Sequence, residues 1–384
     1  MFTSHCKALL YLKGITVRTT AISQLHFPLL QHNTFTFFVK LGSSTPKQQS
    51  FTVSYLVNNC GLSQETALSA SKQIQFETSE KPDSVLAFFR NNGFSNTQIS
   101  RIVKVFPKVL FAKPGKSLRP KLEFFRSKGA SSSEILDIVS GWPRLLLASL
   151  KNQIIPSYEL VKSLLHSDKR TITCLTRNAG IIAYSPLAIN IKMLRDNGVP
   201  DANIAFLLYY SPYFFDRNPV TARVKLQEVK EMGFSPSRFH FIVAVRVKAN
   251  MRKSTWQRKV CVYKRWGWSE EAILAAVCKH PCCMASSENK ITAVMDIFVN
   301  QLGLDSLVLA KRPVVLSLSL KKRIIPRFSV LQFLLSKGLI NKNAGLVTPF
   351  TLTDMSFLQK FVNHFKEEAP ELLKLYEEKL TLSG

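Results

Sequence analysis

Acidic residues are scarce in this chain, and none occurs before Glu65. The 384 residues include 25 acidic against 52 basic side chains, which gives a formal net charge of +27 and a pI near 9.9. A fold does not need such an imbalance, and the repulsion between like charges opposes it. The scarcity of acids therefore indicates a polyanionic partner, and nucleic acid is the first expectation.

Long apolar runs are also missing. No uninterrupted stretch approaches the roughly 18 residues that span a bilayer, so we expect no integral membrane association. The seven cysteines are odd in number and scattered through a chain too large to need disulfides, which favours a reducing compartment. Because 46% of the residues are hydrophobic, the chain can bury one large core or a continuous array of small ones.

Motifs of catalysis are absent as well, since no Walker loop, dinucleotide fingerprint or nucleophile elbow occurs. Cys278, His280, Cys282 and Cys283 offer the ligand types that zinc prefers. However, Pro281 interrupts them, and Cys283 stands where other repeats carry an apolar core residue. We expect no enzyme, no catalytic residues, no metal site and no cofactor.

Residues 1–49 have the composition of an organellar transit peptide, with no acid, five basic residues and many serines and threonines. Their aliphatic residues are interspersed with Lys13, Gly14 and Arg18, whereas a secretory signal has one compact apolar block. We expect this leader to be cleaved or disordered. It favours the mitochondrion, with the chloroplast as the alternative location.

A ladder of glycines organises the rest of the chain. Successive glycines lie 34 to 36 residues apart, at Gly93, Gly129, Gly198, Gly233, Gly267, Gly303 and Gly338, with one double step in which His166 stands near the missing place. A proline follows fourteen residues after four of them, at Pro107, Pro143, Pro212 and Pro281. Val247 and Gly180 take the proline's place in two repeats, and Pro313 arrives early in another.

Between glycine and proline the apolar residues recur with helical spacing. In the first repeat they are Ile99, Ile102, Val103 and Phe106, at i, i+3, i+4 and i+7. Each repeat therefore predicts a helix that ends at the glycine, a second helix that ends near the proline, and a short apolar turn. No such repeat can bury its own faces, so we expect an all-α solenoid of about eight or nine stacked repeats forming a curved superhelix. The expected domains are the leader 1–49, the array 50–345, and a C-terminal helical cap with an acidic tail over 346–384.

The proline turn carries a family resemblance. Pro107-Lys-Val-Leu, Pro143-Arg-Leu-Leu and Pro212-Tyr-Phe-Phe resemble the repeat of the mTERF (mitochondrial transcription termination factor) family. The opening around Phe51 and the Cys60-Gly-Leu-Ser segment look like its large plant branch. Pentatricopeptide and tetratricopeptide arrays have nearly the same period but lack this turn. The resemblance implies a basic concave surface that holds duplex DNA or structured RNA, and roles in organellar transcription, its termination or RNA processing.

Basic residues concentrate in places where phosphates could be bound. The stretch 246–265 has no acid and carries interleaved aromatic residues, and a second basic cluster spans 311–327. One residue past the proline position stands a row of basic or aromatic residues. The candidate nucleic-acid-binding residues are Lys108, Arg144, Tyr213, Lys248, Arg252, Lys253, Arg258, Lys259, Arg265, Lys321, Lys322, Arg323 and Arg327. Another row, three residues before the glycines, is better explained by cations that complement helix C-termini.

Two functional hypotheses remain. The leading one is a monomeric regulator that binds organellar double-stranded DNA or structured RNA, with transcription or splicing machinery as candidate protein partners. The alternative is a non-enzymatic helical scaffold for organellar assemblies such as ribosome or polymerase complexes. The scaffold predicts an apolar groove and weak dependence of binding on salt, whereas phosphate binding predicts a steep one.

Overall fold

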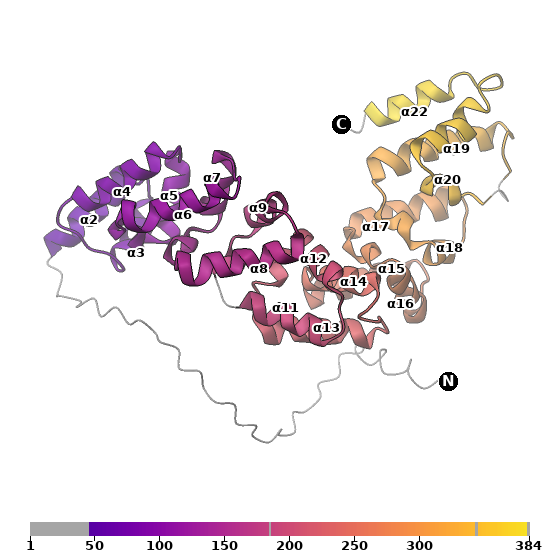
Figure 1. Ribbon diagram of the computed structural model, residues 1–384. Helices are drawn as coiled ribbons and strands as arrows, with labels where there is room; N and C mark the ends of the chain where they lie inside the picture. The colour runs from indigo at the N-terminus through magenta and orange to yellow at the C-terminus, as the bar shows by residue number, and fades with distance from the viewer. Residues whose placement is uncertain (1–45, 184–185, 342–344, 382–384) are drawn as a thin grey trace. The chain divides into compact units, whose positions relative to one another are not determined.

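The computed structural model describes residues 46–183, 186–341 and 345–381, with side chains from residue 51 onward. These residues form helices and turns and contain no strand, so the expected all-α class is confirmed (Figure 1). The first 45 residues of the expected leader lie outside the described residues.

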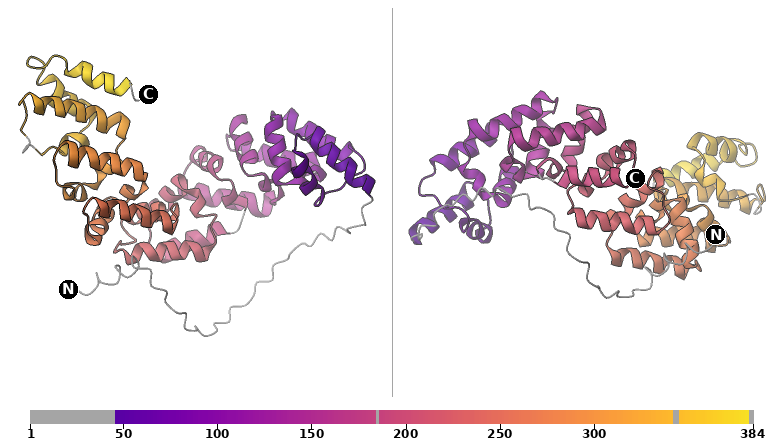
Figure 2. Two further views of the ribbon diagram at one scale, coloured as in Figure 1. Left: turned by 180° about the vertical axis from the view of Figure 1, so that it is seen from behind. Right: turned by 60° about the horizontal axis from the view of Figure 1, so that its bottom comes forward.

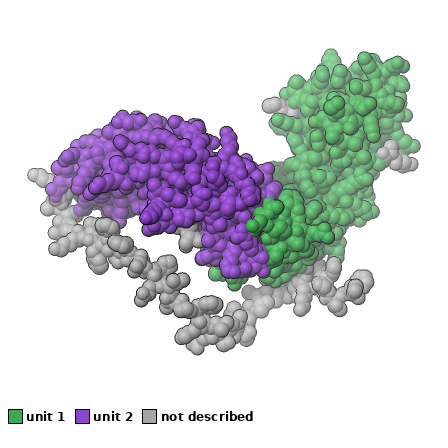
Figure 3. Space-filling view, viewed as in Figure 1, with its two compact units in different colours: residues 1–15, 197–203, 220–384 green, residues 16–196, 204–219 purple. Residues whose placement is uncertain are grey.

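The described chain divides into two compact units (Figure 3). Unit 2, purple in the figure, contains residues 46–183, 186–196 and 204–219. Unit 1, green, contains residues 197–203, 220–341 and 345–381.

The helices follow one another in a repeating order of α-helix, α-helix and 3₁₀ or π turn. In the first half of the chain they are α2 (Pro46–Asn58), α3 (Gln64–Ser71), α4 (Glu80–Asn91), α5 (Asn96–Val105), η2 (Pro107–Phe111), η3 (Pro114–Leu118), α6 (Arg119–Ser127), α7 (Ser132–Gly141), η4 (Pro143–Leu147), η5 (Leu150–Ile154), α8 (Ile155–Leu165), α9 (Asp168–Arg177), α10 (Gly180–Ala183) and α11 (Pro186–Asp196). They continue with α12 (Asp201–Tyr210), η6 (Pro212–Phe214), α13 (Pro219–Glu231), α14 (Phe239–Ala249), α15 (Lys253–Arg265), α16 (Glu270–Lys279), η7 (Pro281–Ala285), α17 (Glu288–Asp296), η8 (Ile297–Gln301), α18 (Leu307–Lys311), η9 (Pro313–Ser317), η10 (Leu320–Ile324), α19 (Ile325–Ser336), α20 (Thr348–Thr351), α21 (Asp354–Phe357), η11 (Leu358–Asn363) and α22 (Leu372–Thr381).

The glycine ladder marks helix ends, as the sequence predicts. Gly93 has φ +86° and Gly129 φ +81°, the left-handed conformation that closes a helix. His166 adopts φ 53° in the place of the missing glycine, which confirms that the long step contains two repeats. The next helix then begins at a serine, and Ser95 and Ser131 each form a reciprocal capping box.

Proline shapes the turn on both of its sides. A 3₁₀ turn begins at Pro107, and the corresponding turns begin at Pro143, Pro212, Pro281 and Pro313. A π turn then leads into a helix with proline at its second position, as at Pro120, Pro156 and Pro326. Since proline has no N–H and its ring clashes with the carbonyl four residues earlier, the wider π turn accommodates it.

The irregular repeats fold differently for identifiable reasons. Val247 does not interrupt the helix, so α14 continues to Ala249 and no 3₁₀ turn follows. Gly180 begins the short helix α10 instead of a 3₁₀ turn. Pro313 arrives early because α18 is only five residues long.

The segment expected to cap the array packs onto α19. Helices α19 and α22 lie side by side, as Figures 1 and 2 show. Their contact is filled by Val330 and Leu334 of α19 with Phe357, Leu372 and Tyr376, all buried. The C-terminal helices thus close the apolar face of the last repeat.

Candidate nucleic-acid interface

The exposed faces of the proline turns in unit 2 carry a cation and an apolar side chain. A 3₁₀ helix has three residues per turn, so the first and fourth positions after the proline lie on the same face. In η2 this face presents Lys108 and Phe111, and in η4 it presents Arg144 and Leu147. Leu147 is 61% exposed. Tyr213 takes the first position in η6 and is half exposed.

The corresponding faces in unit 1 are uncharged. They present Cys282 and Ala285 in η7, and Val314 and Ser317 in η9. The basic residues that the sequence suggests along these turns are therefore found in unit 2. In unit 1 the exposed basic residues lie on other elements.

Lys248 is a correction to that row. It lies within α14 rather than on a turn, and its side chain is 13% exposed. Its ammonium is 3.5 Å from Glu228 and 3.8 Å from the centroid of the Trp256 ring. These internal partners, and not a phosphate, occupy its charge.

The densest basic stretch does produce a basic hollow. A cavity of about 530 Å³ lies between α14, α15 and η7 and is lined by Arg246, Val247, Asn250, Met251, Arg252, Thr255, Lys259 and Ala285. None of the described residues that line it carries a carboxylate. Lys253 and Arg265 of the same stretch are exposed, and Arg258 is also exposed but pairs with Glu288 at 2.9 Å.

The N-terminus of α15 has no side-chain cap, in contrast to similar helix starts. At Ser149, Ser287 and Ser319 the hydroxyl accepts a hydrogen bond from the backbone N–H three residues later. Arg252 occupies the cap of α15 and makes no such bond. The free N–H groups and the positive end of the helix dipole favour an anion there, and Arg252 and Thr255 of this first turn line the hollow.

Lys259 is a second correction. It is 6% exposed, and its ammonium donates to the carbonyl of Met284 at 2.8 Å. Burial lowers its pKa. It therefore lines the hollow and joins α15 to η7, instead of projecting towards a partner.

Arg327 is a third correction, and it reveals a feature that the sequence reading missed. It is fully buried and donates to the carbonyls of Pro349 (2.7 Å), Phe350 (3.2 Å) and Leu352 (2.8 Å), and to Asp354. Its guanidinium also lies 4.7 Å from the centroid of the Phe357 ring. The guanidinium thus contacts the segment from Pro349 to Phe357 and does not project towards a partner.

Lys121 occupies the place of Arg327 in an earlier repeat. It is buried, and its ammonium donates to the carbonyl of Leu146 in the next proline turn. Both cations directly follow a proline near a helix start, at Pro120 and Pro326. A basic residue directly after such a proline was therefore the sequence signal for an internal contact between repeats.

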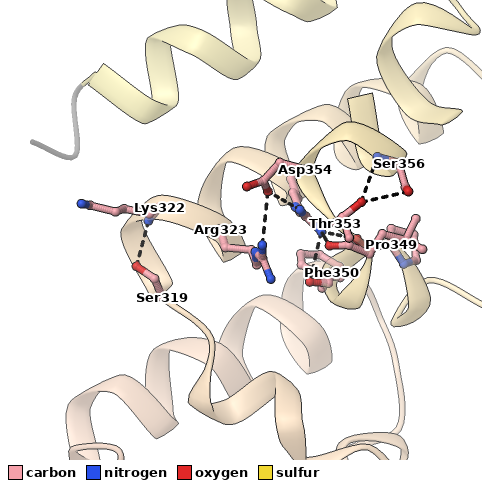
Figure 4. A network of polar contacts seen from close by, with 10 residues as sticks. Ser319, Lys322, Arg323, Pro349, Phe350, Thr353, Asp354 and Ser356 are labelled. Atoms are coloured by element: carbon pink, nitrogen blue, oxygen red, sulfur yellow. Dashed lines mark hydrogen bonds and ion pairs between the residues drawn. The ribbon is translucent and has the colours of Figure 1, made fainter. Parts of the chain in front are cut away.

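The rest of the second cluster is divided. Lys321 and Lys322 are exposed, and Lys322 extends away from the polar network around Asp354 (Figure 4). Arg323 turns towards that network and lies 3.4 Å from Asp354. Lys321 and Lys322 thus keep their charge at the surface.

The comparison with protein families agrees with this architecture. Residues 86–310, more than half of the chain, match the profile of the mTERF family. The chain belongs to the mTERF family. Proteins of this family are nucleic-acid-binding helical-repeat proteins, which connects the family to regulation of organellar gene expression. No curated protein sequence matches the chain.

Two cations of the row before the glycines connect neighbouring repeats of this mTERF protein. Arg126 donates to the Asn92 side chain at 3.0 Å, and Lys230 donates to the Asn197 side chain at 2.6 Å. In each case the acceptor directly precedes the glycine of the repeat before. These cations thus have partners between repeats, in addition to their favourable place at the end of a helix.

The cysteine-rich segment of the mTERF protein lies in and beside the core. Cys283 is 1% exposed, and burial raises its pKa to about 12. The Cys278 thiol donates to the carbonyl of Met232, and the His280 ring bonds the hydroxyl of Ser317 at 2.8 Å. In the part of the chain that the structure describes, no three His, Cys, Asp or Glu side chains gather as metal ligands. No helix within the described ranges is long and apolar enough to cross a membrane.

Proposed function

We propose that this mTERF protein binds double-stranded DNA or structured RNA in an organelle and so regulates transcription, its termination or RNA processing. The leader, which has no acid and is rich in threonine and serine taken together, supports import. It favours the mitochondrion, with the chloroplast as the alternative.

The hollow of unit 1 is the observation that carries the proposal. Arg246 and Arg252 line a cavity that has no carboxylate among its described lining residues, beside the uncapped first turn of α15. A phosphate oxygen placed there would accept from the helix N–H groups and lie near both cations. Asn250 and Thr255 add neutral polar groups. Exposed Lys253, Arg265, Lys321 and Lys322 extend the positive surface of the same unit.

The test is a titration of the full chain against duplex DNA and structured RNA at several salt concentrations. Each phosphate contact contributes a slope of about 0.9 to the log-log dependence of affinity on salt. We expect the double variant Arg252→Ala/Lys253→Ala to lower that slope by about 2. The matched control is Lys360→Ala/Lys366→Ala, which removes two exposed cations of the same unit that lie outside the hollow.

The result also separates the two functional hypotheses. Absence of binding at low salt, or equal slopes for the two double variants, would contradict the proposal and favour the protein scaffold. Equal binding of DNA and RNA through this hollow would support it, because phosphate contacts carry no base information.

A further inference from the structure

A second hollow, within unit 2, has a different chemistry from that of unit 1. Its volume is about 460 Å³, and it is formed by α5, α7, α9 and η6. Its polar and aromatic lining residues are Arg101, Asp137, Trp142, Arg177, Asn178 and Tyr213. Small-molecule sites typically have roughly 300–1,000 Å³, so the space suffices for a nucleotide.

This hollow is built where the repeat pattern breaks. Gly180 stands in the place of the turn proline, and a Cβ on it would lie 2.6 Å from the indole of Trp142. Trp142 itself occupies the place that Phe106 takes in the first repeat. The larger aromatic residue and the glycine thus fit one another, and a proline would collide with the indole. Departures from a repeat rule are expected at functional sites.

Buried hydrogen bonds hold the wall in position. Asn178 is 3% exposed, and its side-chain oxygen accepts from the Gly180 N–H at 2.9 Å. Its amide group donates to Asp216 at 3.4 Å. The Tyr213 hydroxyl donates to the carbonyl of Arg177 at 2.6 Å, which fixes the half-exposed ring at the rim.

Charged groups of both signs face the hollow. The Arg177 guanidinium donates to the carbonyl of Tyr209 and lies 4.7 Å from the centroid of that ring. Arg101 and Asp137 are exposed and have no hydrogen-bond or ion-pair partner within the described residues. A carboxylate repels phosphates but accepts hydrogen bonds from the amino and imino groups of bases. The presence of Asp137 therefore favours a site for a base with its phosphate over a site for backbone phosphates alone.

We propose that this hollow binds one unpaired nucleotide of an RNA or DNA strand. The base stacks against Tyr213 or Trp142, Asp137 accepts hydrogen bonds from its edge, and Arg101 and Arg177 hold the adjoining phosphate. In a duplex both faces of a base are covered by its neighbours, so only an unstacked base enters. The inference rests on the proposed nucleic-acid function and names the ligand that unit 2 adds to it.

The experiment compares three probes on the full chain: single-stranded oligouridine, a blunt duplex, and the same duplex with one unpaired uridine. The test variants are Tyr213→Ala and Arg101→Gln. The controls are Tyr210→Ala, which removes an equally exposed ring outside the lining (52% for both), and Lys104→Gln, which removes a charge from the same helix α5. Thermal melting of every variant confirms that it is folded.

We expect both test variants to bind the two probes with unpaired uridine roughly ten-fold more weakly than their controls do. Affinity for the blunt duplex should equal that of the controls. A loss confined to oligouridine identifies a free strand as the source of the nucleotide, and a loss that includes the bulged duplex extends the site to unpaired positions in duplexes. A 5-iodouridine in the probe should photocrosslink to Tyr213 or Trp142.

Two outcomes would overturn the inference: losses equal to those of the controls, or equal losses with all three probes. Either can occur while binding of the blunt duplex still depends on Arg252 and Lys253, in which case the proposed function stands. If none of the probes binds at low salt, the proposed function itself fails.

Discussion

The proline turns of the two units share a backbone and differ in what they expose. In unit 2 the turn faces pair Lys108 with Phe111 and Arg144 with Leu147, whereas in unit 1 Val314 and Ser317 stand in these places. Burial constrains the apolar side of each turn, because neighbouring repeats must pack against it. The exposed side has no such constraint, so the two units could acquire different surfaces on one scaffold.

Buried cations tie successive repeats in both units, and Arg327 differs from the lysines Lys121 and Lys259 in the number of contacts that it makes. Lys121 in unit 2 donates one hydrogen bond to the next turn. Arg327 in unit 1 reaches three carbonyls and Asp354 from the same place after a proline. A planar guanidinium presents five N–H donors in a fixed fork, and an ammonium presents three on a flexible stem. The C-terminal segment should therefore depend more heavily on Arg327 than the turn η4 depends on Lys121.

The largest effect is expected for Arg327→Ala. It leaves three carbonyls without their donor and empties the space above Phe357. We expect unit 1 to lose about 3 kcal/mol of unfolding free energy, measured by urea denaturation. Amide hydrogen exchange in α22 should accelerate, because α22 packs on α19 together with Phe357, whose ring lies against the Arg327 guanidinium.

Arg323→Ala is the matched control for that change. Arg323 lies 3.4 Å from the same carboxylate but is 30% exposed, so its loss should cost less than about 1 kcal/mol. Equal losses for the two variants would show that Asp354, and not the buried carbonyl contacts, holds the segment.

A smaller effect is expected for Lys121→Met in unit 2. Methionine fills a similar volume but leaves the Leu146 carbonyl without its donor, at a cost of about 1 kcal/mol near neutral pH. Burial lowers the pKa of Lys121, so in alkaline solution the folded state binds fewer protons than the unfolded state. The unfolding free energy of the wild type therefore rises with pH because of this group. Its difference from the unfolding free energy of Lys121→Met should widen from pH 7 to pH 9.5.

Arg327 provides the contrast, because a guanidinium stays protonated throughout this range. The stability difference between the wild type and Arg327→Ala should not change with pH. A Lys121→Met difference that is equally flat would show that the ammonium is not desolvated in the folded state.

The fold could be predicted from the spacing of the apolar residues, because equivalent positions are buried in each repeat. The places of Ile99, Ile102 and Val103 recur in register, and a one-place shift would expose them. Even the missing glycine could be located, since His166 adopts the same left-handed conformation. The predicted turn was wrong where another residue replaced the proline. Helix α14 continues through Val247, whereas Gly180 begins the short helix α10.

The candidate site was predicted less completely, because the number of basic residues in a stretch does not show which of their side chains reach the surface. Arg252 and Lys253 lie at the surface as expected, while Lys259, six residues further on, is buried against Met284. Lys248 and Arg327 likewise found partners that lie far away in sequence. The hollow around Trp142 could not be predicted, since it depends on the contact of that ring with Gly180.

The smallest effect tests whether the difference between the turn faces matters for binding. Arg144→Ala should lower the log-log salt slope by about 0.9, if each turn cation of unit 2 contacts one phosphate. Val314→Lys places a cation at the corresponding, 38% exposed position of unit 1, and we expect no change in slope because the cations of that unit cluster at α15 instead. Both substitutions are at the surface, so unfolding free energies should stay within about 0.5 kcal/mol of the wild type. A slope that rises by about 0.9 with Val314→Lys would mean that the turn faces of both units meet nucleic acid. Their difference would then be one of charge alone, and not of binding mode.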